Sequence, residues 1–296
     1  MPDLSDTPDL NGIAARARAY ADLFSLPLED RHWRGNPGDH SGAGLGSSLD
    51  FQDHRHYLPG DDPRRINWQA YARTGNYTLK LYREEVQPIV EIVFDVSDSM
   101  FADPRKADRA LELFYFAWAS GEKNGAATSA WIVKGSRWKA LEPAAVFSHR
   151  WRSAVDELPS TGASASPNLA TVRFRPRSLR ILVSDLLFLA SPEPFLRTLL
   201  QGTGRAAVLC PFSSSESDPA WSGNYEFVDS ESGGRHNRRV DRSTLRLYLD
   251  AYRRHFDGWK VAALRSQTPL ARVPALGSFE AALKLEAISA GAVNLA

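Results

Sequence analysis

Short apolar runs and longer amphipathic stretches alternate along the chain from about residue 88 to the end. The short runs have the length and the Val, Ile and Leu content of buried strands, whereas the stretches between them repeat their apolar residues every three to four positions, as helices do. Strands are expected at residues 89–94, 127–133, 179–184, 206–211 and 225–228, with a last one near 271–276. This alternation predicts an α/β fold with a mostly parallel sheet flanked by helices.

Helices are expected between these strands, and the clearest one begins at Pro104 and runs to Gly121 or Gly125. Asp103 precedes that proline, and an aspartate at the N-cap followed by proline is a strong start signal. Residues 111–118 are apolar on nearly every side, which indicates a helix buried over most of its surface. The other helices of this region are expected at residues 146–158, 192–201, 244–255 and 278–289.

Residues 1–86 lack the regular alternation of apolar runs and amphipathic stretches. They are expected to form an N-terminal segment that precedes an α/β domain at 87–296. Residues 10–24 have the apolar stripe of a short helix, whereas residues 50–86 are extended and polar. Acidic and basic side chains balance in 50–86, so this stretch lacks the positive excess that a nucleic-acid surface needs. Its arginines and aspartates either pair to hold it against the α/β domain or contact a partner.

Composition and charge exclude several classes of protein. The 296 residues carry a formal net charge of +1, which gives no global attraction to nucleic acid or to an anionic membrane. The single cysteine, Cys210, excludes an internal disulfide and a cysteine-based zinc site, and its apolar neighbours predict a packed strand residue. No apolar stretch reaches the ~20 residues that span a bilayer, and the first residues lack the pattern of a secretory signal. We therefore expect a cytoplasmic protein without direct membrane insertion.

Short oxygen-bearing side chains occupy alternating positions at the end of the first predicted strand of this domain: Asp95, Ser97 and Ser99. Asp185 follows a later strand, and the polar loop 159–164 lies between them in the chain. Ligands of open parallel sheets bind beyond the C-terminal ends of the strands, so these residues are expected to converge there. Hydroxyl and carboxylate oxygens suit a hard cation, although helix and loop capping is the simpler explanation.

The combination of D-x-S-x-S after the first strand, a threonine in a later loop and an aspartate after another strand resembles the von Willebrand factor A domain. In that family these positions form a metal ion-dependent adhesion site, which usually holds Mg²⁺. The resemblance implies that Ser97, Ser99 and Thr161 would ligate the ion directly, while Asp95 and Asp185 would act mainly through water. Mn²⁺ and Ca²⁺ are alternative ions. The loop offers three further hydroxyls, those of Ser160, Ser164 and Ser166.

A longer motif carries a second resemblance. The stretch RHYLPGDDPRRINW at 55–68, followed by ARTG at 72–75, resembles the hallmark of the bacterial DUF58 family, in which this motif precedes an A-type domain. Asn67 stands where that family usually has aspartate. The resemblance implies a binding protein that works beside a MoxR-type AAA+ ATPase, or with its client, in the assembly or maturation of protein complexes.

The expected function is therefore that of a non-enzymatic, protein-binding adaptor or co-chaperone. Mg²⁺ requires six oxygen ligands, and neutral hydroxyls leave much of its charge uncancelled, so a partner's carboxylate can complete the shell. One alternative is a metal-dependent, phosphatase-like hydrolase with Asp95 as nucleophile, although Ser97 stands where the second acid of such enzymes is usual. Another is a scaffold whose metal site is degenerate and binds no metal.

Overall fold

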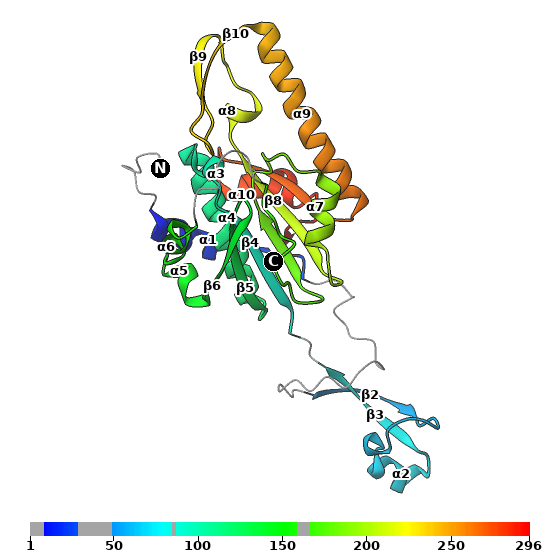
Figure 1. Ribbon diagram of the computed structural model, residues 1–296. Coiled ribbons are helices and arrows are strands. Elements are labelled where there is room, and N and C mark those ends of the chain that lie inside the picture. The colour runs from blue at the N-terminus through cyan, green and yellow to red at the C-terminus, as the bar shows by residue number, and fades with distance from the viewer. Residues whose placement is uncertain (1–8, 29–48, 85–86, 159–165) are drawn as a thin grey trace. The chain divides into compact units, whose positions relative to one another are not determined.

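A six-stranded sheet forms the centre of the larger of two compact units in the computed structural model (Figure 1). The structure describes residues 9–28, 49–84, 87–158 and 166–296. The first unit combines Met1–Leu28 with Pro88–Ala296, and the second is Glu29–Gln87. The early helix that the sequence groups with residues 1–86 therefore lies in the α/β unit.

The central sheet has the strand order β11-β8-β7-β4-β5-β6. Neighbouring strands are parallel, except for the antiparallel pair of β5 and β6 at one edge. The strands are β4 Ile89–Asp95, β5 Ala127–Lys134, β6 Arg137–Leu141, β7 Leu179–Val183, β8 Arg205–Phe212 and β11 Leu270–Pro274. The predicted α/β fold with a mostly parallel sheet is confirmed, and its arrangement is of the Rossmann type.

Helices cover both faces of this sheet (Figure 1). Phe94 of β4 stacks on Phe114 of α4 with ring centroids 4.6 Å apart, while Val93 packs on the other face in a cluster that includes Trp259 of α9. A strand buried on both sides explains the continuous apolar run of β4. The helices of this unit are α1 Leu10–Tyr20, α3 Asp98–Phe101, α4 Pro104–Lys123, α5 Pro143–Phe147, α6 Trp151–Asp156, α7 Pro192–Leu199, α8 Ser214–Ser217, α9 Arg242–Arg265 and α10 Phe279–Ala282, which continues into the π-helical turn η3 Leu283–Ala287.

The strand order reverses beside β4. The chain passes from β4 to β5 on one side and later places β7 on the other side of β4. In open parallel sheets, the crevice beyond the C-terminal ends of two such strands is the usual ligand site. Asp95 ends β4 and Asp185 follows β7, so both residues lie at this crevice.

One expected strand lies outside the central sheet. Residues 225–228 belong to β9 Gly223–Val228, which forms an antiparallel hairpin with β10 Arg235–Val240. The hairpin leads into α9, and its turn lies beside α3 (Figure 1). The hydrophobic pattern does not predict β10, because every residue of this strand except Val240 is polar and exposed.

The helix expected at 146–158 is divided into α5 and α6. His149 lies between them with a φ of 59°, a left-handed conformation that ends a helix. Its ring nitrogens contact the Tyr115 hydroxyl at 2.7 Å and the Asn11 side-chain oxygen at 3.0 Å. Contacts with two other helices therefore hold His149 at the break.

Residues 24–26, which follow α1, pack against one side of the α/β unit. Leu26 donates its backbone N–H to the buried Ser120 hydroxyl of α4 at 2.9 Å, and Phe24 is buried. The short strand β1 Phe24–Ser25 pairs with β12 Asn294–Leu295, so the segment after α1 is joined to the C-terminal segment. No helix in the described part of the chain is long and apolar enough to cross a membrane.

The second unit contains the DUF58-like motif. Its strands β2 Leu49–His56 and β3 Thr78–Glu84 form an antiparallel hairpin that holds η2 Pro63–Arg65 and α2 Trp68–Thr74 between them in the chain. The Arg55 guanidinium makes two hydrogen bonds to the Asp61 carboxylate, at 2.8 and 2.6 Å. This arginine–aspartate pair is thus internal to the unit.

Candidate functional site

Asp95 is the last residue of β4, and its carboxylate is completely buried. One oxygen accepts a hydrogen bond from the backbone N–H of Ser97 at 3.0 Å, and the other accepts from the Ser184 hydroxyl at 2.7 Å. Because Ser184 follows β7, this side chain links the two strands at the point where the strand order reverses. Burial, and then the charge of Asp185, raises the pKa of Asp95 to about 7.

Ser97 lies on the turn that leads from β4 into α3, and Ser99 is the second residue of α3. Their hydroxyl oxygens are 3.2 Å apart. Ser97 occupies the N-cap of α3 without a side-chain capping bond, whereas Asp103 caps α4 by accepting from two backbone N–H groups at 2.9 and 3.2 Å. Helix capping therefore explains why an aspartate stands at position 103. It does not explain the paired hydroxyls of Ser97 and Ser99.

Asp185 is the second residue after β7 and is almost completely buried. Its backbone N–H points at the sulfur of the buried Met100 in α3, at 3.1 Å, and its Oδ1 accepts from the backbone N–H of Leu187 at 3.0 Å. Leu186 has a φ of 58°, which is strained for a branched side chain. The backbone thus turns sharply here and directs the Asp185 carboxylate inward.

Lys106 adds a positive charge that the sequence does not predict. It lies in the first turn of α4, is 1% exposed, and donates to Asp185 Oδ2 at 2.9 Å and to the Glu216 carboxylate. Burial lowers the pKa of Lys106, but the charges of Asp185 and Glu216 outweigh it and hold the pKa above its usual value. The only local signal is a lysine in a first helical turn, where the helix dipole disfavours cations.

A carboxylate from the β9–β10 hairpin also reaches this cluster. Glu231 accepts a hydrogen bond from the backbone N–H of Ser99 at 2.9 Å, across 132 positions of sequence. Burial raises the pKa of Glu231, and the charges of Asp98 and Asp185 add to that effect, while the Ser99 bond and Lys134 oppose it. Nothing in the local sequence pattern marks this glutamate, because its partner is set by the tertiary fold.

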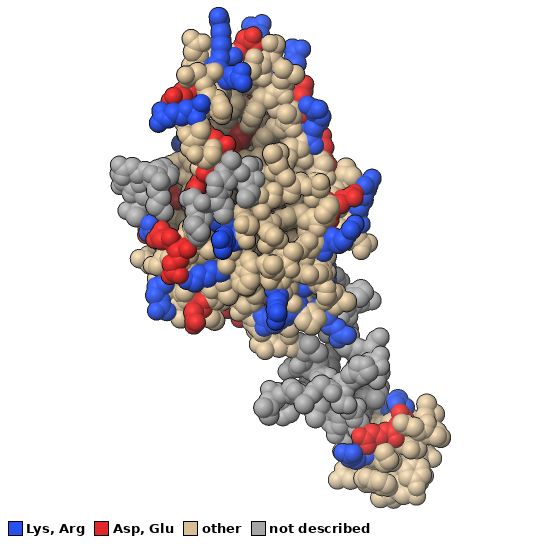
Figure 2. Space-filling view, in the orientation of Figure 1, with Lys and Arg blue, Asp and Glu red and all other residues tan. Residues whose placement is uncertain are grey.

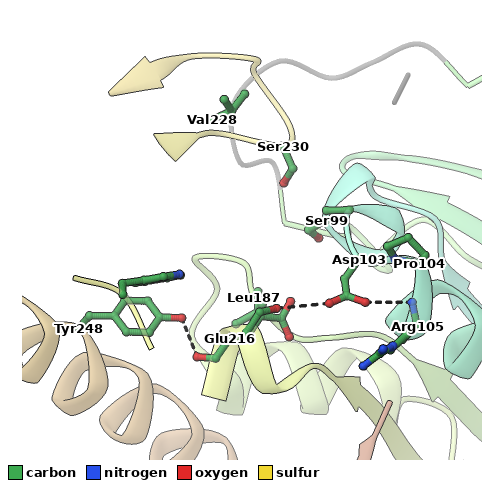
Figure 3. Close-up of a pocket in the computed structure, with 12 residues that line it drawn as sticks. Ser99, Asp103, Pro104, Arg105, Leu187, Glu216, Val228, Ser230 and Tyr248 are labelled. Carbon is green, nitrogen blue, oxygen red and sulfur yellow. Dashed lines mark hydrogen bonds between the residues drawn. The ribbon is translucent and has the colours of Figure 1, made fainter. Parts of the chain in front are cut away.

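A pocket of about 740 Å³ opens beside Ser99 (Figure 3). Figure 3 shows the hairpin residues Val228 and Ser230 on one side, with Tyr248 of α9 donating its hydroxyl hydrogen to the backbone oxygen of Glu216 at 2.7 Å. The lining combines polar groups with apolar side chains. It consists of Ser99, Ala102, Asp103, Pro104, Arg105, Leu187, Ser215, Glu216, Trp221, Val228, Ser230 and Tyr248.

Four of the five predicted site residues, Asp95, Ser97, Ser99 and Asp185, lie at the same crevice. Thr161 lies outside the described residues, as do Ser160 and Ser164. Among the residues that the structure describes, no group of three or more His, Cys, Asp or Glu side chains is arranged to hold a metal. The candidate metal ligands are instead the hydroxyls of Ser97 and Ser99 and the carboxylates of Asp95 and Asp185. Their oxygen atoms are of the kind that hard cations bind.

Fold and site together define a Rossmann-type α/β protein with a hydroxyl- and carboxylate-lined crevice at the strand-order reversal of its sheet. The family model DUF58, described as a protein of unknown function, matches residues 53–257. The match covers the motif of the second unit and most of the α/β unit, so the chain belongs to the DUF58 family, as its motif predicts. No curated protein matches the chain.

Proposed function

We propose that this DUF58 protein is a non-enzymatic adaptor that binds a protein partner through a Mg²⁺ ion at the crevice. The supporting observation is the convergence of Asp95, Ser97 and Ser99 with Asp185 where the strand order reverses. Following the von Willebrand factor A resemblance, the two hydroxyls would contact the ion directly and the two aspartates would act through water. When bound, the ion would supply a positive anchor for a carboxylate of the partner.

The oxygen atoms of the crevice are compatible with Mg²⁺. Adjacent ligands of an octahedral ion at roughly 2.1 Å lie about 3.0 Å apart, and the hydroxyl oxygens of Ser97 and Ser99 are separated by 3.2 Å. Neither hydroxyl carries a charge, so an ion held by them keeps its attraction for a further anion. The hydrogen bonds from Ser97 and Ser184 fix the orientation of Asp95 behind them.

The pocket beside Ser99 offers a place for the partner. Val228 is largely exposed, and Trp221 lies next to Tyr248 with ring centroids 5.0 Å apart, so an apolar wall stands beside the polar groups. A protein segment that carries an acidic residue beside an apolar one would match this lining. The DUF58 resemblance suggests a MoxR-type AAA+ ATPase, or its client, as the source of that segment.

A second candidate function is a scaffold that works without metal. The observation that favours it is the Lys106 ammonium, which already supplies a positive charge to Asp185 at 2.9 Å. If this charge replaces the ion, the crevice would be a structural joint between β7 and α4, and partner binding would not depend on Mg²⁺.

The test compares wild type with Ser99→Ala and with the matched control Ser289→Ala, which removes an exposed hydroxyl of the C-terminal segment. Mn²⁺ binding is followed by electron paramagnetic resonance with Mg²⁺ as competitor, and binding of a purified MoxR-type ATPase is measured with Mg²⁺ or with EDTA. We expect wild type and control to bind ion and ATPase, and Ser99→Ala to lose roughly tenfold or more in both affinities, since tenfold corresponds to about 1.4 kcal/mol.

Equal ATPase binding in EDTA and in Ser99→Ala would contradict the metal-dependent adaptor and favour the scaffold. Turnover of an aryl phosphate, measured on the same preparations, addresses the hydrolase alternative. Turnover that disappears in Asp95→Asn would overturn the non-enzymatic assignment, because a carboxylate nucleophile cannot be replaced by an amide.

A further inference from the structure

We propose that Glu231 is an internal ligand of the crevice: a carboxylate on the β9–β10 turn that occupies the position of the partner's acidic side chain until the partner displaces it. This inference rests on the proposed function, because it assumes that the crevice holds Mg²⁺ and receives an anion. It adds to that function a group within the chain that competes with the partner.

The position of Glu231 is the first observation. Its Oε1 accepts the Ser99 N–H at 2.9 Å, which places a carboxylate against the residue whose hydroxyl pairs with that of Ser97. The neighbouring carboxylates are already paired, Asp98 with Lys134 at 2.7 Å and Asp185 with Lys106 at 2.9 Å. Glu231 adds a further negative charge to this group, and a divalent cation at the crevice would attract it.

The turn that carries Glu231 is built to hold it in place. The Asp229 Oδ1 accepts from the backbone N–H groups of Glu231 and Ser232, both at 2.9 Å. The backbone of Asp229 exchanges two hydrogen bonds with residues 233 and 234, both at 2.8 Å, and Gly233 supplies the positive φ of 69° that the turn requires. The carboxylate is therefore presented by an ordered turn rather than by a free chain.

The surroundings give an incoming carboxylate a route to the same place. Ser230, next to Glu231, lines the pocket that contains Ser99 (Figure 3). Basic side chains gather over the hairpin and the start of α9 (Figure 2), where an acidic segment would be attracted before it reaches the crevice. These exposed arginines are Arg235, Arg238, Arg239, Arg242 and Arg246.

A carboxylate that only fastens the hairpin to α3 would produce the same hydrogen bond, so the test must separate the two roles. The variant is Glu231→Gln, which keeps the size of the side chain and the ability to accept from Ser99 but removes the charge. The matched control is Glu226→Gln on the same hairpin, where Glu226 is exposed and pairs with Arg235 at 3.0 Å. Circular dichroism checks that all three proteins share one fold.

Two affinities are measured on the full-length chain. The first is for Mg²⁺, by calorimetry; the second is for N-acetylglutamate amide in saturating Mg²⁺, by the chemical shift of the Ser99 backbone amide. We expect Glu231→Gln to bind Mg²⁺ at least about fivefold more weakly than wild type, because an anionic ligand is lost. We expect the same variant to bind the glutamate probe at least about fivefold more tightly, because its competitor is gone. Glu226→Gln should match wild type in both.

The outcomes separate this inference from the proposed function. If wild type binds Mg²⁺ but Glu231→Gln binds ion and probe with unchanged affinity, Glu231 is only a structural fastening and the inference is wrong. If wild type shows no Mg²⁺ binding at all, the proposed function fails and the internal ligand fails with it.

Discussion

At the scale of single residues, Lys106 and Asp185 form a buried ion pair. Its desolvation penalty and the attraction between its charges are both large. Each charge was removed from water on folding, and the pair is favourable only because the two groups, with Glu216, satisfy one another. Removing one charged side chain leaves its partner as an uncompensated charge inside the protein, which strongly destabilises the folded state.

We predict that Lys106→Met lowers the free energy of unfolding by about 3–5 kcal/mol, the range for a broken buried pair. The control is Lys123→Met on the same helix, whose ammonium pairs with Asp22 at 2.8 Å on the surface. That change should cost about 1 kcal/mol or less. Urea unfolding of both variants measures the difference. Similar costs for the two lysines would show that the Asp185 pair is not buried as described.

Asn67 shows how one residue of the family motif can change while its structural role is kept. It is the N-cap of α2, where its side-chain oxygen accepts from the backbone N–H of Ala70 at 3.2 Å. Aspartate, which the DUF58 motif usually has here, caps helices equally well. The motif position is therefore explained by capping, and that role does not need the charge.

At the scale of elements, α9 shows that periodicity predicts the face of a helix better than its length. The sequence predicts a helix over 244–255, whereas α9 spans Arg242–Arg265. The apolar stripe continues through Trp259 and Ala263, both buried against the sheet in the cluster that includes Phe195 of α7. Packing against α7 and the sheet thus stabilises three further turns.

We predict that Trp259→Ala lowers the free energy of unfolding by about 3–5 kcal/mol, as expected for a large aromatic side chain removed from a core. Trp259 contacts the rings of Phe188 and Phe195 with centroids 5.7 and 5.5 Å away. The control Trp259→Phe should cost much less. It keeps an aromatic ring and removes a buried indole N–H that has no hydrogen-bond partner within the described residues.

Chemical denaturation followed by far-ultraviolet circular dichroism measures both Trp259 variants. A small loss for Trp259→Ala, close to that of Trp259→Phe, would mean that α9 is not anchored through this residue.

At the scale of the whole molecule, the chain enters the α/β unit, leaves it and returns. Met1–Leu28 belongs with Pro88–Ala296, and the second unit is inserted between them in sequence. Buried Ile13 and Ala17 of α1, with Phe24 and Leu26 after it, show that the first segment completes the core of the α/β unit. The unit boundary therefore falls after residue 28 as well as before residue 88.

We predict that replacing Glu29–Gln87 with a flexible Gly/Ser linker of about 15 residues leaves the α/β unit folded, with a thermal midpoint within a few degrees of wild type. Deleting residues 1–87 instead should lower its stability by several kcal/mol, because the eight buried apolar side chains of residues 10–28 are lost from its core. Calorimetry of the two proteins provides the comparison. Equal stability of both would show that α1 is dispensable to the core.

The sequence alone determined the fold class, the family and most strands and helices of the α/β unit, although it predicted neither β6 nor β10. These features depend on local periodicity, on capping residues such as Asp103 and on a contiguous motif at 55–75, so they can be seen in short windows of sequence. The prediction of one continuous helix at 146–158 was wrong. The conformation of His149 is set by contacts with Tyr115 and Asn11, which lie far away in sequence, and not by its neighbours in the chain.

Only the tertiary structure decided which groups meet at the crevice. The sequence placed Asp95 and Asp185 at strand ends, and the strand order brought them together. It gave no sign that Lys106 would be buried against a carboxylate 79 positions away, or that Glu231 would reach Ser99 across 132 positions. Such pairs depend on strand order and on the path of a hairpin, which are set by packing of the whole chain and have no local signature.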